Sequence, residues 1–141
     1  MMKKAQIFIW LSCLILIIGG CTHNGGPSGD LYGRWHLERI DGENMEVPTQ
    51  RGDLYWAFQK NVVQIQRDNG FHSFSRIYGT FRKDEDFLYL DFPIEEEDSP
   101  FAETGLGRQN KLQIQKMTSK EMVLIYHPEG DKSLIYYFRK W

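Results

Sequence analysis

From Gly33 to the carboxyl terminus, hydrophobic and polar residues alternate in short runs. Alternation with a period of two is the pattern of β-strands that bury one face, and no window of helical length shows a sustained helical period. The runs are rich in β-branched and aromatic residues, which favour strands. The pattern predicts eight strands, at residues 34–40, 54–60, 62–68, 71–82, 87–92, 111–117, 122–127 and 134–140.

Most segments between these strands are short and contain turn-forming residues such as Asn, Asp and Gly. Short turns join antiparallel neighbours, so the strands are expected to follow one another as an up-and-down meander. The exception is the connection 93–110, in which Ser99 and Pro100 have the residue types that begin a helix. Residues 30–32 are expected to form one helical turn before the first strand.

The number of strands decides between closed and open architectures. An open sheet of this size exposes two edges, whereas a closed barrel exposes none. We therefore predict an all-β fold, an eight-stranded antiparallel up-and-down barrel with at most a short helix in the 93–110 connection. A two-sheet sandwich is the alternative, although sandwiches usually need longer crossovers than these turns provide.

The amino terminus carries the features of an export signal. Lys3 and Lys4 precede the apolar run 7–18, which is shorter than the roughly 20 residues of a membrane-spanning helix. The sequence Ile18-Gly19-Gly20-Cys21 follows, and it resembles the lipobox of bacterial lipoproteins with Ile in place of the commoner Leu. The resemblance implies cleavage before Cys21 and acylation of its thiol.

This interpretation divides the chain into a signal peptide at 1–20, the acylated Cys21 with a flexible Gly-rich tether at 21–30, and a barrel domain at 31–141. The mature chain then has 141 − 20 = 121 residues, with 17 − 2 = 15 basic against 19 acidic residues and a net charge of −4. Cys13 leaves with the signal and acylation uses Cys21, so the folded part has no thiol for disulfides, catalysis or metal binding.

Acyl chains on Cys21 would anchor the domain to a membrane. Thr22 follows the cysteine in place of the Asp that retains lipoproteins in the inner membrane of enteric bacteria. No acidic cluster of the kind found in some surface lipoproteins follows it. We therefore expect an outer-membrane lipoprotein of the cell envelope that faces the periplasm. The net negative charge argues against nucleic acid as a partner.

Gly33-Arg34-Trp35, at the start of the first predicted strand, resembles the Gly-x-Trp motif of lipocalins and related calycin barrels. In that family the Trp closes one barrel end and a basic residue of the last strand covers it. Arg139 is our candidate for this basic residue, and Lys140 remains open as the other one. The resemblance implies a small bacterial lipocalin-like lipoprotein.

Catalytic chemistry is sparse, and we expect neither an enzyme nor a metal or cofactor. His36 and Glu38 share a strand face that is expected to meet solvent. A metal site would need His36, His72 and His127 to meet by chance. The acidic run 95–98 lacks the spacing of a calcium loop. Asp91 lies in an apolar strand, where it could line a barrel mouth together with Tyr89.

Two non-enzymatic functions remain open. A barrel interior lined by aromatic rings would bind a small apolar or amphipathic ligand, or the same rings would simply fill the barrel. The inward candidates are Trp56, Phe58, Tyr78, Tyr89, Tyr126 and Tyr136.

The second function is a protein-interaction module of the envelope, such as a scaffold, a hydrolase inhibitor or a homodimer. The strands 122–127 and 134–140 are apolar on both faces, whereas a barrel buries only one. Their outer residues would need cover from the 93–110 connection or from a partner. The candidates for this patch are Val123, Ile125, Ile135 and Tyr137.

Overall fold

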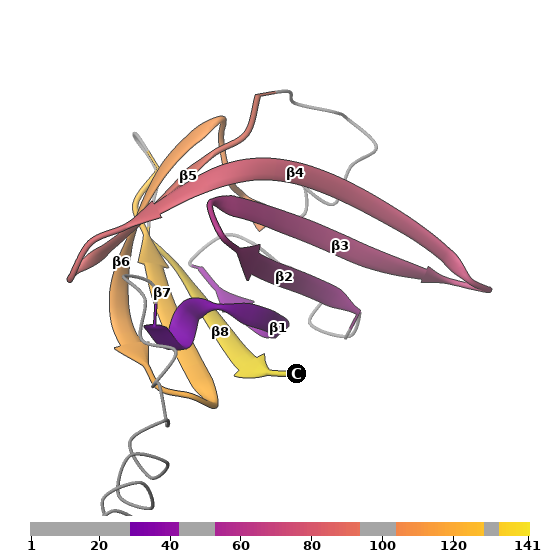
Figure 1. The fold of residues 1–141 in the computed structure, drawn as a ribbon, viewed down its shortest axis with the longest axis horizontal. Coiled ribbons are helices and arrows are strands. Elements are labelled where there is room, and N and C mark those ends of the chain that lie inside the picture. The colour runs from indigo at the N-terminus through magenta and orange to yellow at the C-terminus, as the bar shows by residue number, and fades with distance from the viewer. Residues whose placement is uncertain (1–28, 43–52, 94–103, 129–132) are drawn as a thin grey trace, which may run out of the picture.

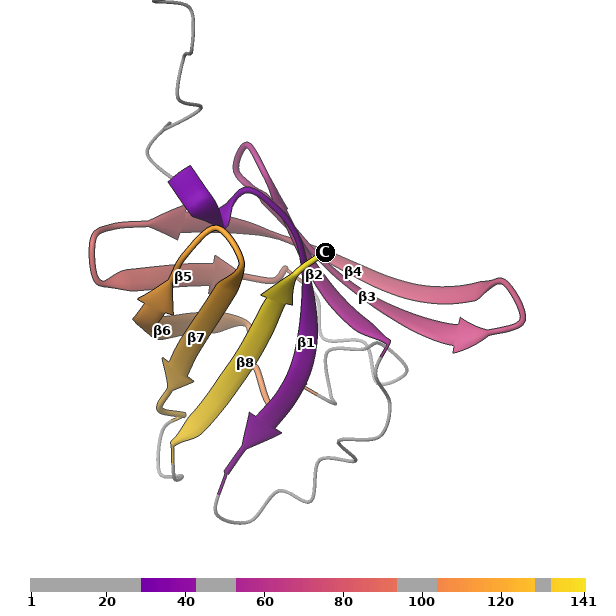
Figure 2. The same cartoon turned by 90° about the horizontal axis from the view of Figure 1, so that it is seen from below.

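Eight antiparallel strands close into one barrel in sequence order, β1 to β8 (Figures 1 and 2). This is the architecture of a computed structural model that describes residues 29–42, 53–93, 104–128 and 133–141. A 3₁₀ turn, η1 (Gly29–Leu31), precedes the strands. The strands are β1 (Gly33–Asp41), β2 (Leu54–Gln59), β3 (Val62–Gly70), β4 (Ser73–Lys83), β5 (Phe87–Asp91), β6 (Gln109–Met117), β7 (Glu121–Tyr126) and β8 (Leu134–Lys140).

The predicted all-β barrel is confirmed, and the sandwich alternative is excluded because β1 pairs with both β2 and β8. The helical turn expected at 30–32 begins one residue earlier, at Gly29. The signal peptide, most of the tether and the helix expected at Ser99 and Pro100 lie outside the described residues.

Alternation along each strand places one largely apolar face inside the barrel. In β5, Leu88 and Leu90 are buried while Tyr89 and Asp91 lie on the outer face. In β8, Leu134, Tyr136 and Phe138 are buried. The inward side chains form a single hydrophobic cluster, as expected when eight strands enclose a space that side chains fill.

Gly79 lies where β4 gains its second neighbour. Before this residue β4 pairs with β3 alone, and from Thr80 it also pairs with β5. A Cβ atom there would lie 2.4 Å from the Asp91 carbonyl oxygen and 2.6 Å from the Phe92 ring. Only a residue without a side chain permits this approach of the two backbones. The glycine therefore faces inward, and Ile77 and Phe81 on either side of it are buried.

The hairpin formed by β3 and β4 extends beyond the barrel wall (Figures 1 and 2). Pairing between β2 and β3 ends at Leu54 and Arg67, and pairing between β4 and β5 begins only at Thr80 and Asp91. Among the described strands, the end of the hairpin therefore has no neighbour on either side. Its tip was predicted as part of a strand beginning at Phe71, but β4 begins at Ser73.

Candidate functional site

One end of the barrel is closed by the residues that carry the Gly-x-Trp motif. Trp35 has no exposed surface, and its indole N–H donates to the Leu31 carbonyl at 2.8 Å. Leu31 is fully buried beneath the strands, so η1 acts as a plug. Gly33 has a φ of 117° and lies against Lys140: an added Cβ would be 2.9 Å from the Lys140 Cε atom. The motif glycine makes room for the lysine.

The cation that covers Trp35 is Lys140, so our choice of Arg139 was wrong. The Lys140 ammonium lies 4.3 Å from the centre of the Trp35 ring. It also donates to the carbonyl oxygens of Asp30, at 2.7 Å, and of Tyr32. Arg139 points outward and pairs with Glu38 at 3.1 Å. Burial lowers the pKa of Lys140, and the charge of Asp30 opposes part of that shift.

The same alternation that places Tyr136 inside the barrel leads through Phe138 to Lys140. Arg139 is one residue out of phase with this face, and it is paired in register with the outward His36. The signal that distinguishes the two cations was therefore present in the strand pattern.

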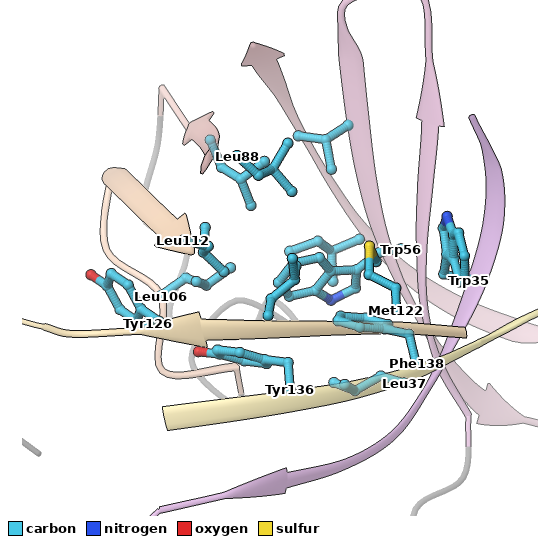
Figure 3. Packing of buried hydrophobic residues seen from close by; sticks show 14 of the residues in the cluster. Trp35, Leu37, Trp56, Leu88, Leu106, Leu112, Met122, Tyr126, Tyr136 and Phe138 are labelled. Atoms are coloured by element: carbon cyan, nitrogen blue, oxygen red, sulfur yellow. The ribbon is translucent and has the colours of Figure 1, made fainter. Parts of the chain in front are cut away.

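An aromatic cluster occupies the middle of the barrel. The Trp56 ring lies 4.8 Å from that of Phe138 and 5.5 Å from that of Tyr136, centre to centre. Figure 3 shows Trp35 near one end of the core and Tyr126 near the other, with Trp56, Met122 and Phe138 between them. Of the six predicted ligand-binding residues, four lie in this interior: Trp56, Phe58, Tyr126 and Tyr136.

Trp56 holds a buried polar atom without a partner. Its indole nitrogen has essentially no exposed surface and no hydrogen-bond acceptor within the described part of the chain. The rest of the buried cluster around it is uncharged. A buried donor without an acceptor lowers the free energy of unfolding by about 1–3 kcal/mol. An acceptor atom of a ligand placed beside this N–H would therefore form a favourable hydrogen bond.

The other end of the barrel is partly covered by residues 104–110. The Asn110 side chain accepts from the Gly107 N–H at 2.7 Å and donates to the Gly107 carbonyl at 2.7 Å, which fastens this loop to β6. Leu106 is buried, and the Tyr136 hydroxyl donates to the Thr104 carbonyl at 2.6 Å. Burial raises the pKa of the Tyr136 phenol far above its usual value, and the neighbouring Tyr126 adds to the rise.

Tyr78 and Tyr89, the other two predicted ligand-binding residues, do not enter the barrel. Tyr78 is 54% exposed. Tyr89 lies on the outer face of β5, where the Arg82 guanidinium covers its ring at 3.9 Å and its hydroxyl donates to Asp84 at 3.2 Å. The apolar residues of both strands take the inner face, and the phenol groups stay near water.

The remaining polar candidates are dispersed. His36 packs against Tyr55, His72 lies exposed at the hairpin tip, and His127 contacts the Ser133 hydroxyl at 2.7 Å. Within the described ranges, no three metal-ligating side chains come together. Asp91 is exposed on the outer face of β5, where it lines a surface pocket together with Tyr89. The acidic run 95–98 lies outside the described residues.

The predicted interaction patch lies on the outer face of β7 and β8, as expected, but its side chains are only partly exposed. Val123 pairs across the strands with Tyr137, and Ile125 with Ile135. The Arg39 guanidinium covers the Tyr137 ring at 3.8 Å. Much of this apolar surface is therefore shielded within the chain itself.

The large exposed apolar side chains lie elsewhere, and the strand pattern did not predict their exposure. Five are found among the described residues, and four of them belong to β3, β4 and the turn between them. These four are Val62, Phe71, Phe74 and Tyr78. The fifth, Trp141, packs edge-on against Tyr55.

Comparison with known protein families identifies the family of this barrel. A model of the lipocalin-like domain family matches residues 14–141. The chain belongs to the lipocalin-like domain family. Its fold is thus of a type built to bind ligands. None of the curated proteins compared with the chain matches it.

Two solved structures share the lipocalin-like fold. A lipocalin-like protein from Bacteroides uniformis is 16% identical, with a TM-score of 0.60 over 80% of this chain and 100% of its own. An uncharacterized protein from Bacteroides eggerthii is 20% identical, with a TM-score of 0.62 over 79% of this chain and 99% of its own. In the described part of this chain, no helix is long and apolar enough to span a membrane.

Proposed function

We propose that the chain is an acyl-anchored envelope lipoprotein whose barrel binds one small, uncharged, largely apolar ligand that carries a hydrogen-bond acceptor. The observation behind the ligand class is the unpaired indole N–H of Trp56 in an uncharged core. A charged headgroup in that position would lose its hydration without gaining a counter-charge. A carbonyl or ether oxygen would instead accept from the indole.

Ligand entry requires side chains to move, because Trp56, Tyr136 and Met122 have no exposed surface. Met122 pairs across the strands with Phe138, whose ring lies 4.8 Å from that of Trp56. Methionine adapts to new surroundings more easily than a ring does. Tyr136 is held by its bond to Thr104. Displacement of the Met122 side chain toward the barrel end is therefore the simplest route to space beside the indole.

The test compares two probes, a medium-chain methyl ketone and the alkane of equal length. We expect the ketone to bind the wild-type protein about tenfold more tightly, which corresponds to ~1.4 kcal/mol. Trp56→Phe removes the donor but keeps an aromatic ring, so it should abolish this preference. Phe58→Leu is the matched control, because it changes the interior without changing a polar group. Equal affinity of both probes for the wild type contradicts the proposal.

A filled barrel that acts as an interaction module is the second candidate. It is favoured by the same complete burial of Trp35, Trp56 and Tyr136, which leaves no water-sized space against these rings. Native mass spectrometry of protein purified from membranes separates the candidates. A bound small molecule supports the ligand-binding barrel, and empty protein that fails to bind both probes supports the interaction module.

The anchor is tested separately on the amino-terminal peptide of the membrane fraction. Acylation of Cys21 is expected, together with loss of residues 1–20. An unmodified Cys21, or cleavage beyond it, would exclude the anchor. Protease treatment of intact cells tests the periplasmic orientation, because a barrel that faces the periplasm is protected until the outer membrane is opened.

A further inference from the structure

The tip of the β3–β4 hairpin, residues 67–76, is called the finger here. Its turn is unusual: Phe71 and His72 have φ angles of 49° and 62°, and Gly70 and Ser73 pair on either side of them. A two-residue hairpin turn with positive φ at both positions normally carries Asn-Gly, because bulky residues are strained there. The chain contains Asn69-Gly70 just before, yet the turn falls on Phe71 and His72.

Polar groups of the finger bond to one another and hold this turn. Asp68 accepts from the Gly70 N–H at 2.8 Å. Asn69 accepts from Arg67 at 2.8 Å and donates to the Ser75 hydroxyl at 2.8 Å. The local bonds fix a tip at which the Phe71 ring stands fully in solvent, with an exposed fraction of 103%.

The finger combines aromatic rings with positive charge. Phe74 is 47% exposed, and the Arg76 guanidinium lies 5.5 Å from the centre of its ring. Residues 67–76 contain two arginines and one aspartate, a net charge of +1. The whole chain has a net charge of −2. Aromatic and basic side chains together are typical of segments that enter the headgroup region of an anionic bilayer.

We propose that the finger inserts into the surface of an anionic lipid bilayer, with Phe71 and Phe74 among the headgroups and Arg76 facing lipid phosphates. The ten residues of the finger are few compared with the roughly 20–30 residues per side of a stable protein interface. A bilayer imposes no such requirement on shape or area.

The proposal rests on the acyl anchor proposed above, which supplies proximity. Seven residues separate Cys21 from Gly29, and the chain between these two residues spans at most about 28 Å. The nine residues of β1 are about 30 Å long. A tether of this length allows the barrel to lie on its side, so that the finger and the anchor reach one membrane.

The test uses the complete mature lipoprotein in vesicles of phosphatidylethanolamine and phosphatidylglycerol. Because the folded part has no thiol, Ser73→Cys carries a nitroxide label at one site beside the two rings. Glu85→Cys, on the exposed turn between β4 and β5, is the matched control. We expect the label at position 73 to be shielded from a water-soluble relaxing agent, and the label at 85 to remain accessible.

Phe71→Ser together with Phe74→Ser should return the label at 73 to water while the protein stays on the vesicles through its acyl chains. Unchanged thermal unfolding of this variant checks that it folds. Full accessibility at 73 in the acylated wild type overturns the proposal and leaves the anchor intact. Shielding only in native envelopes, and not in vesicles, points to a protein partner and also overturns the proposal.

If Cys21 carries no acyl chain, the test is flotation of the wild type and of the double variant with the vesicles. Equal flotation of the two proteins overturns the insertion.

Discussion

At the scale of single residues, Lys140 and Tyr136 show two ways in which a polar group at an end of the barrel finds partners. The Lys140 ammonium lies over the Trp35 ring and donates to the carbonyl groups of Asp30 and Tyr32. Tyr136 stays neutral and donates to the Thr104 carbonyl. Both side chains fasten the ends of the barrel to segments that lie outside its wall.

Lys140→Met retains the aliphatic chain but removes the cation and its hydrogen bonds. We expect the free energy of unfolding to fall by about 1–3 kcal/mol, because the carbonyl groups beside Trp35 lose their donor. Arg139→Met is the control, since an exposed ion pair contributes only about 0–1 kcal/mol. Urea denaturation of the two variants measures the difference. Equal losses would mean that Lys140 has no special role in closing the barrel.

Tyr136→Phe should cost about 1 kcal/mol at neutral pH through the lost hydrogen bond. The raised pKa of the folded phenol makes this difference depend on pH. Above the unfolded pKa of about 10, the unfolded wild type loses its phenol proton while the folded state keeps it. The stability from Tyr136 is thus complete below about pH 10 and falls by ~1.4 kcal/mol per pH unit above it. The wild type should therefore approach the variant in alkaline urea titrations, whereas parallel profiles would contradict the buried phenol.

At the scale of elements, the two halves of β4 have different neighbours. Its second half pairs with β3 and β5, and its first half pairs with β3 alone among the described strands. The change occurs at Gly79, where the Asp91 backbone comes close. Ile77 and Gly79 take the inner face there, so Tyr78 between them lies outside the barrel, and its expected inward position was wrong.

Gly79→Ala tests this junction. The added methyl group would meet backbone and ring atoms that have no space to retreat, so we expect a loss of about 1–3 kcal/mol or more. Gly107→Ala is the matched control, because its Cβ would come no closer than 3.8 Å to its neighbours. That variant should remain within about 1 kcal/mol of the wild type. Thermal and urea unfolding measure both variants, and a harmless Gly79→Ala would show that β4 and β5 can separate freely.

At the scale of the whole molecule, both ends of the domain meet at the closed end of the barrel. The Lys140 ammonium and the Tyr32 carbonyl are 108 residues apart in sequence, yet they are bonded. Closure therefore depends on the pairing of β1 with β8, the most distant strands along the chain. Such long-range contacts are expected to make folding slow for a domain of this size.

The barrel holds this closure without a disulfide. Both cysteines lie at or before position 21, so the folded part contains no disulfide. We expect the thermal midpoint of the mature protein to be the same with and without dithiothreitol. A shift caused by the reductant would reveal a disulfide between molecules through an unacylated Cys21, and would argue against the anchor.

The sequence by itself determined the number of strands, their order and the closed barrel. Alternation reports which residues share a face, and short turns force neighbours to pair. It also carried the Gly-x-Trp motif at the start of β1. These features are local, so a single segment contains the information that specifies each of them.

Only the tertiary structure decided which face of β4 and β5 turns inward, because this depends on the close approach of two strands at Gly79. It also left the Trp56 N–H without an acceptor in the described core, and placed the turn on Phe71 and His72 instead of Asn69-Gly70. These features depend on the register between strands and on contacts between segments that are distant along the chain. Local periodicity contains no information about such contacts.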